Sequence, residues 1–312
     1  MKSKKFRSTL ITFGLVIAAF IVCQVMISTG SMTRSLKGQL VPICAYVVMA
    51  VSLNLTVGIS GELSLGHAGF MSVGAFSGIV MAMWLSKGVG VENQTLCLLL
   101  AILTGGVAAG IAGVIIGIPA LRLRGDYLAI VTLAFGEIIR NVINCLYISL
   151  DGQSLHIAFN NPNVPGKLLV NGPAGATGVT KIATFGMGFA LVLFTLFVVL
   201  NLIDSRSGRA IMAIRDNRIA AEAMGLNVTK YKMMAFVTSA VLAGMAGALY
   251  GLNFSTVAAS KFKFDTSILV LVFVVLGGIG NIRGSIISAT LLTILPELLR
   301  AFANYRMLIY AI

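Results

Sequence analysis

Long apolar runs, each about as long as a membrane-spanning helix, alternate with short polar stretches along this 312-residue chain. Charged residues make up 11% of the sequence and hydrophobic residues 58%, whereas a soluble domain carries about 25% charged residues. A helix needs roughly 20 apolar residues to cross the hydrocarbon core of a bilayer. The sequence therefore predicts one all-α, multi-pass membrane domain over residues 1–312, with eight to ten spans.

The first apolar run follows four basic residues near the N-terminus and is long for a signal peptide. We therefore expect a retained first span, with residues 1–8 in the cytoplasm. This orientation puts 13 basic residues in inner segments and 9 in outer ones, in agreement with the positive-inside rule. The expected spans are at about residues 9–27, 40–57, 65–86, 96–118, 127–148, 183–203, 233–253, 266–280 and 285–299, and a tenth, which we expect to be truncated, begins at Met307.

The most strongly charged segment, residues 204–232, lies between the sixth and seventh runs. It contains SRSGRAIMAIRDNRIAAEAMGLNVTKYK, with six basic and two acidic side chains, so it cannot cross a bilayer. With the N-terminus inside, this segment is a cytoplasmic loop. A loop of this kind can dock another protein or only fix the topology, and its residues alone favour neither function.

A short helix is predicted inside this loop, over the residues RIAAEAM. Asp216 or Asn217 can cap its start, and Gly225 can end it. Arg218 and Glu222 are four residues apart, so they share one face of the helix and can pair. The amphipathic helix is suited to docking.

The longest outer loop, residues 149–182, contains Pro162, Pro165 and Pro173 among several asparagines and glycines. These residues favour turns over regular structure. The sequence predicts an irregular, exposed loop.

Two glycine-rich interruptions break the helical pattern: GISGELSLGHAGF at residues 58–70 and GGIGNIRGS at residues 277–285. Matching interruptions in two halves of a membrane chain indicate an internal repeat with a transport site nearby. The alternative is that the glycines only allow close helix packing. The candidate pathway residues at the two breaks are Asn54, Gly61, Glu62, Ser64, Gly66, His67, Gly277, Gly278 and Asn281.

Glu137 and Arg140 lie within the fifth run, three residues apart on one helix face. Ionisable residues inside a membrane are costly and usually face a bundle interior or a wet cavity. The pair can line a pathway or lock helices as a neutralised pair. We favour the second role, because no second unpaired charge lies at a similar depth.

Several classes of function are disfavoured. The four cysteines and two histidines lack metal-ligand spacing, so no metal or cofactor is expected. The chain has no P-loop and no catalytic triad order, so we predict a transport subunit that is not an enzyme. The basic residues lie between spans without interleaved aromatics, which does not favour nucleic-acid binding. A transporter without a nucleotide site or coupling charges needs an outside energy source, which the charged loop could receive.

Four blocks give the chain a family resemblance: SLNLTVGISGELSLGHAGFMSVGA, RLRGDYLAIVTLAFGEIIRNV, GRAIMAIRDNRIAAEAMGLNVTKYK and VFVVLGGIGNIRGSIISA. In this order they resemble the branched-chain amino-acid ABC transporter permeases, in the LivM-like branch. The match runs from about Val41 to Leu299. It implies a type II importer fold of ten spans in two inverted halves, in a bacterial cytoplasmic membrane.

The resemblance also implies partners: a LivH-like sister permease, two cytoplasmic ATPases and an external solute-binding protein. It places the ATPase-coupling loop on Arg215, Asp216, Arg218, Ala220, Ala221, Glu222, Ala223 and Gly225. The small alanines would allow close approach to the ATPase, and the charges would fix orientation. Relatives of similar sequence carry urea or short amides, which is one alternative. A stand-alone channel or secondary carrier is the other.

Overall fold

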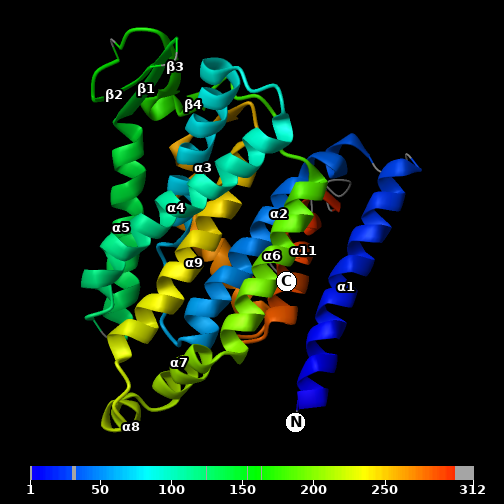
Figure 1. The fold of residues 1–312 in the computed structure, drawn as a ribbon, viewed down its shortest axis with the longest axis vertical. Helices are drawn as coiled ribbons and strands as arrows, with labels where there is room; N and C mark the ends of the chain where they lie inside the picture. Colours follow the sequence, from blue (N-terminus) through cyan, green and yellow to red (C-terminus); the bar gives the residue numbers. More distant parts are fainter. Residues whose placement is uncertain (1, 30–32, 124, 153, 163, 299–312) are drawn as a thin grey trace.

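The computed structural model describes residues 2–29, 33–123, 125–152, 154–162 and 164–298, as a bundle of long helices with a small sheet at one end (Figure 1). A helix occupies each of the nine predicted runs in this part of the chain, whereas the tenth run lies outside it. The helices of these runs are α1 (Lys2–Ser28), α2 (Arg34–Asn54), α3 (His67–Met83), α4 (Gln94–Ala120), α5 (Asp126–Asn144), α6 (Phe185–Asp204), α9 (Val228–Gly251), α10 (Phe264–Leu276) and α11 (Ile282–Leu298).

Two of these helices continue as π-helical turns, η1 (Leu55–Ile59) after α2 and η2 (Trp84–Val89) after α3. Within the described residues, five helices are long and apolar enough to cross a membrane. The molecule is therefore a multi-pass, helical membrane protein. The five are Ser35–Ile59, His67–Val89, Gln94–Ala120, Phe185–Asp204 and Val228–Gly251, and shorter apolar helices cover Thr12–Ser28 and Phe264–Leu276.

Residues 149–182, which were predicted to form an irregular loop, are not irregular, so that prediction was wrong. This segment forms most of a five-stranded antiparallel sheet in the order β2-β1-β3-β4-β5. Its prolines mark connections, because two lie between β2 and β3 and Pro173 lies in the 3-10 turn η3 (Gly172–Ala174). Leu169 and Val170 are fully buried. The strands are β1 (Leu146–Asp151), β2 (Ser154–Phe159), β3 (Lys167–Asn171), β4 (Ala176–Thr177) and β5 (Thr256–Val257).

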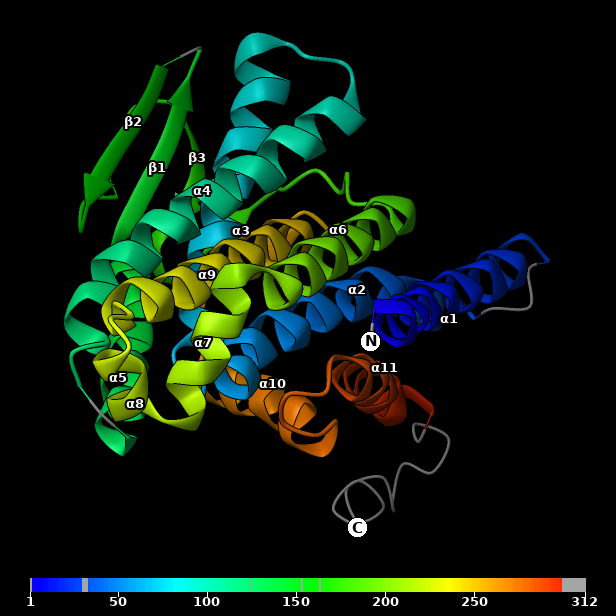
Figure 2. The same cartoon turned by 60° about the horizontal axis from the view of Figure 1, so that its bottom comes forward.

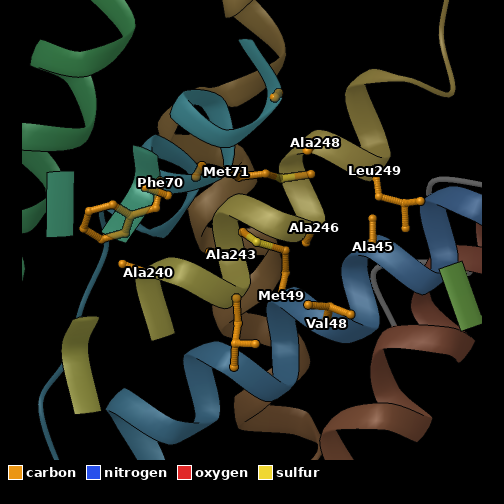
Figure 3. Close-up of a cluster of buried hydrophobic side chains, with 14 of the residues drawn as sticks. Ala45, Val48, Met49, Phe70, Met71, Ala240, Ala243, Ala246, Ala248 and Leu249 are labelled. Carbon is orange, nitrogen blue, oxygen red and sulfur yellow. The ribbon is translucent and has the colours of Figure 1, made fainter. Parts of the chain in front are cut away.

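Glycines bring α3, α4 and α9 into backbone contact. A Cβ on Gly74 would lie 2.1 Å from the carbonyl oxygen of Gly244, and a Cβ on Gly247 would lie 1.9 Å from that of Met71. Neither space admits a side chain, so these glycines serve helix packing. Next to them, side chains of α2, α3 and α9 form the buried apolar core, with Met49, Met71 and the alanines of α9 at its centre (Figure 3).

The α1 helix lies at the outer edge of the bundle (Figure 1 and Figure 2). Its Phe20 stacks on Phe185 and Phe189 of α6, with ring centroids 5.2 and 4.0 Å away. An apolar groove of about 460 Å³ lies between α1, α2, α6 and α11. The first residues of α1 lie at the same end of the bundle as α8 (Arg218–Ala223), opposite the sheet (Figure 1).

Candidate functional site

The charged segment folds into two short helices that project from the bundle at the end opposite the sheet (Figure 1): α7 (Arg206–Asp216) and α8. The predicted short helix is confirmed as α8. Its cap is Asn217, whose side chain accepts a hydrogen bond from the amide of Ala220 at 3.0 Å. Gly225, with φ of +81°, ends it as expected.

Sequence reasoning missed α7 as a separate helix. Ser205 caps it by accepting a hydrogen bond from the amide of Gly208 at 3.0 Å. Ala210, Ile211 and Ile214 are buried on its inner side. A serine cap followed by apolar residues three and four positions apart is the signal that could have found this helix.

Apolar contacts hold α8 against α7 and α9. Ala221 is 5% exposed and packs with Ile214 and Val228. Ala221 is therefore buried within this chain, whereas Ala220 and Ala223 are exposed. Two large apolar side chains point outward here, because Ile219 of α8 is 80% exposed and Met224, which follows the last residue of α8, is 82% exposed.

The charges of the coupling segment, here defined as α7 and α8 with the first turns of α9, are ordered. Arg218 Nε donates to Glu222 Oε1 at 2.9 Å, which confirms the predicted pair. Arg215 pairs with Asp216 at 3.0 Å and also donates from Nη1 to the carbonyl oxygen of Gly58 at 2.8 Å. The second bond joins the coupling segment to the first glycine break.

A second link to the same break comes from an ion pair between Lys232 of α9 and Glu62. Their side chains are only 12% and 11% exposed. Glu62 is therefore neutralised and is not a free pathway charge. Gly61 (φ +74°) supports the neighbouring contact of Arg215, because a Cβ there would lie 2.6 Å from the Cγ of Arg215. The sequence analysis counted Lys232 among the basic residues of the charged segment but did not predict its pairing with Glu62.

The two glycine breaks lie side by side. Asn54 Oδ1 accepts from the amide of Gly280 at 2.8 Å, and its Nδ2 donates to Ser285 Oγ at 2.8 Å. A Cβ on Gly58 would lie 2.4 Å from the nitrogen of Gly280. Asn54 thus bridges two segments that are 226 residues apart in the chain.

The remaining predicted residues of the second break shape its turn. Gly278 has a φ of +89°, and Asn281 Oδ1 accepts from the amide of Gly284 at 3.3 Å as α11 begins. A Cβ on Gly277 would lie 2.4 Å from the carbonyl carbon of Gly284. The break therefore lets α10 and α11 meet at backbone distance.

The far end of the first break packs against α5 and α10. The amide of Leu65 donates to Thr132 Oγ1 at 3.1 Å, and a Cβ on Gly66 would lie 2.1 Å from the carbonyl oxygen of Thr132. His67 is 2% exposed, and its Nε2 lies 2.8 Å from Ser52 Oγ. His67 is therefore a hydrogen-bonded core residue at the start of α3.

Three buried hydroxyl groups in or just before the first break, those of Thr56, Ser60 and Ser64, have no hydrogen-bond partner. The residues are 2–3% exposed. Of the three, only Ser64 was a candidate from the sequence; a hydroxyl at every fourth residue is the pattern that could have found the other two. Within the described residues, no cluster of three or more histidine, cysteine, aspartate or glutamate side chains could hold a metal ion.

The predicted pair in α5 is also present: Arg140 Nε donates to Glu137 Oε2 at 2.7 Å. The side chains are 23% and 33% exposed. The pair therefore lies at the edge of this chain and not at its centre.

If the pair is structural, Glu137→Gln should destabilise the protein more than the double change Glu137→Gln with Arg140→Met. The single change leaves an arginine without its counter-charge, whereas the double change leaves none, and breaking a buried pair costs about 3–5 kcal/mol as an upper bound for this partly exposed one. Thermal unfolding of the detergent-purified protein measures the difference. Equal stability of the two variants, with transport lost in both, would instead support a pathway role.

The chain is similar in sequence to known transport permeases. The family model described as "Branched-chain amino acid transport system / permease component" matches residues 35–312. The permease protein LivM of Salmonella typhimurium is 33% identical over 91% of this chain and 67% of its own length. LivM of Escherichia coli is 34% identical over 84% of this chain and 63% of its own length. The chain thus spans about two thirds of these relatives.

A second group of relatives is more distant. The permease protein LivH of Escherichia coli is 26% identical over 83% of this chain and 83% of its own length. No solved structure matches the chain. With a family model that covers residues 35–312 and LivM relatives at 33–34% identity, the chain belongs to the permease component family of branched-chain amino acid transport systems.

Proposed function

We propose that this chain is a transmembrane subunit of an ABC importer that carries leucine, isoleucine and valine into a bacterial cell. It contributes ten spans in two inverted halves, and residues 1–312 form one permease domain. ATP hydrolysis takes place on separate subunits. The LivM and LivH relatives are named as permease proteins of branched-chain amino acid transport systems, which supports the substrate class.

The observation that carries this proposal is the coupling segment. A projecting helix with two large exposed apolar side chains, Ile219 and Met224, is costly in water and suits insertion into a groove on another protein. Ala220 and Ala223 are exposed beside them and permit close approach. The Arg218–Glu222 pair fixes the orientation of the helix. The partner at this end is a cytoplasmic ATPase.

The contacts of Arg215 and Lys232 give the ATPase a route to the transport pathway. Arg215 binds the Gly58 carbonyl, and Lys232 pairs with Glu62, so two of the six cations of the coupling segment hold the first glycine break. A shift of the coupling segment would move this break relative to the second one. The candidate pathway runs past Asn54, Gly61, Glu62, Ser64, Gly66, His67, Gly277, Gly278 and Asn281.

The importer also needs a LivH-like sister permease and an external solute-binding protein, which meets the sheet end. Reconstitution tests the whole proposal. Vesicles that hold this chain, the sister permease and two ATPases should take up leucine when the binding protein and ATP are supplied. Omission of this chain should abolish uptake. Uptake of urea or short amides without uptake of leucine, isoleucine or valine would contradict the proposed substrate.

The proposed orientation places residues 1–8 and the coupling segment in the cytoplasm. In a variant with the four native cysteines replaced, a cysteine at Ala223 should be unreactive to an impermeant thiol reagent in intact cells. A cysteine at Ala174, exposed in the sheet end, should react. Permeabilised cells should show labelling at both positions. Labelling of the Ala223 position in intact cells would contradict this orientation and would place the coupling segment outside the cell.

A further inference from the structure

Three buried hydroxyl groups in or just before the first glycine break differ from every other buried polar side chain that the structure describes. Twelve others, such as Ser52, Ser72 and Thr195, have a hydrogen-bond or ion-pair partner. The exceptions are Thr56, Ser60 and Ser64. A buried hydroxyl without a partner is destabilising, so three within nine residues need an explanation.

The backbone around Thr56 and Ser60 departs from a regular α-helix. A helical serine or threonine normally donates to a carbonyl three or four residues back, as Thr195 does to Leu191. Here Leu55–Ile59 is a π-helical turn, and the amide of Ser60 already bonds to the carbonyl of Leu55. Single π-helical turns occur frequently at functional sites.

The chemistry of the segment indicates the ligand. A hydroxyl both donates and accepts, so hydroxyl groups can bind an ammonium group and a carboxylate alike. The ionised side chain of the segment, Glu62, is already neutralised by Lys232, so the three hydroxyls are not accompanied by an unpaired carboxylate of this segment. Buried Leu55, Val57 and Ile59 alternate with it and offer apolar contact. This set matches a zwitterion with an apolar side chain.

We propose that Thr56, Ser60 and Ser64 form a binding site for the ammonium and carboxylate groups of a neutral, apolar amino acid, and that the structure holds this site closed. The inference rests on the proposed function. The contact between Gly58 and Gly280, bridged by Asn54, closes the segment on one side. Arg215 and Lys232 hold it from the coupling segment. Movement of the coupling segment opens the site, and the three hydroxyls then bind the ammonium and carboxylate groups of the amino acid.

Conservative variants test the site in the reconstituted complex. Thr56→Val, Ser60→Ala and Ser64→Ala should leave thermal stability unchanged or raised, because no hydrogen bond is lost. Each should slow leucine uptake at saturating binding protein on the order of tenfold, the factor that corresponds to one hydrogen bond to a charged group. The control is Ser72→Ala, whose hydroxyl donates to Gly69 at 3.0 Å. It should lower stability and leave the uptake rate of the folded complex unchanged.

Accessibility gives a second measurement. A cysteine at Ser60 should react slowly with a small thiol reagent in the resting complex and faster when ATP is added. Leucine should protect it, whereas lysine and glutamate should not. Normal uptake by all three variants, no labelling in either state, or equal protection by charged amino acids would overturn the site. Failure of the wild-type complex to transport any branched-chain amino acid contradicts the proposed function instead, so the two failures are distinguishable.

Discussion

A permease in which Ile219 and Met224 are both replaced by aspartate is expected to bind its ATPase subunits much more weakly. These side chains are 80% and 82% exposed at the tip of the projecting helix, and they contribute little to the fold of this chain. Buried apolar anchors at an interface are worth about 2 kcal/mol or more each. Loss of two should weaken ATPase binding roughly a thousandfold, and a buried carboxylate adds a desolvation penalty.

Co-purification of the ATPase with tagged permease measures this loss, and uptake in vesicles should fall with it. The matched control is Ile157→Asp, at a residue that is 63% exposed on β2 at the opposite end. That change also puts a charge on an exposed apolar site, and it should leave ATPase binding intact. Full ATPase binding by the Ile219 and Met224 variant would show that the coupling segment does not dock the ATPase and only fixes the topology of the chain.

The Glu62–Lys232 pair is expected to produce the second large effect, on stability and on coupling separately. Glu62→Gln leaves Lys232 charged and almost buried, and a broken pair of this kind costs about 3–5 kcal/mol of unfolding free energy. The double variant Glu62→Gln with Lys232→Met removes both charges, so it should recover most of the lost stability. Thermal unfolding in detergent measures both values.

In the double variant, the coupling of ATP hydrolysis to uptake should stay impaired although the stability recovers. The double variant lacks one of the two links between the coupling segment and the first break, so ATP hydrolysis should continue while leucine uptake per ATP falls. Lys230→Met is the control, because it removes an exposed charge two residues away on α9 and leaves the pair in place. A double variant with the wild-type ratio of uptake to hydrolysis would show that the pair serves only the fold.

Features that local residues determine could be predicted from the sequence. The α8 helix has its own cap, its own ion pair and its own terminating glycine, all within nine residues, so the pattern identifies it. The apolar runs identify the long helices for the same reason. The sheet was missed because turn residues dominate the composition of the outer loop, although the strands between them are short and regular.

The partners of the site residues could not be predicted, because they are distant in sequence. Glu62 and Lys232 are 170 residues apart, and Asn54 and Gly280 are 226 apart. No local period relates such positions, and only the packed helices bring them together. Both glycine breaks could be recognised in the sequence. The contact between them through Asn54, and the contact of Arg215 with the first break, are evident only in the structure.

The glycine contacts between α3, α4 and α9 also constrain how the molecule assembles during synthesis. The α3 and α4 helices follow one another and can pair as soon as both have entered the bilayer. Ala120 ends α4, but α9 begins only at Val228. Until α9 is inserted, the glycine faces that will receive it remain in contact with lipid. The order of insertion therefore differs from the order of packing, and the central three-helix contact can close only when the last third of the chain is being made.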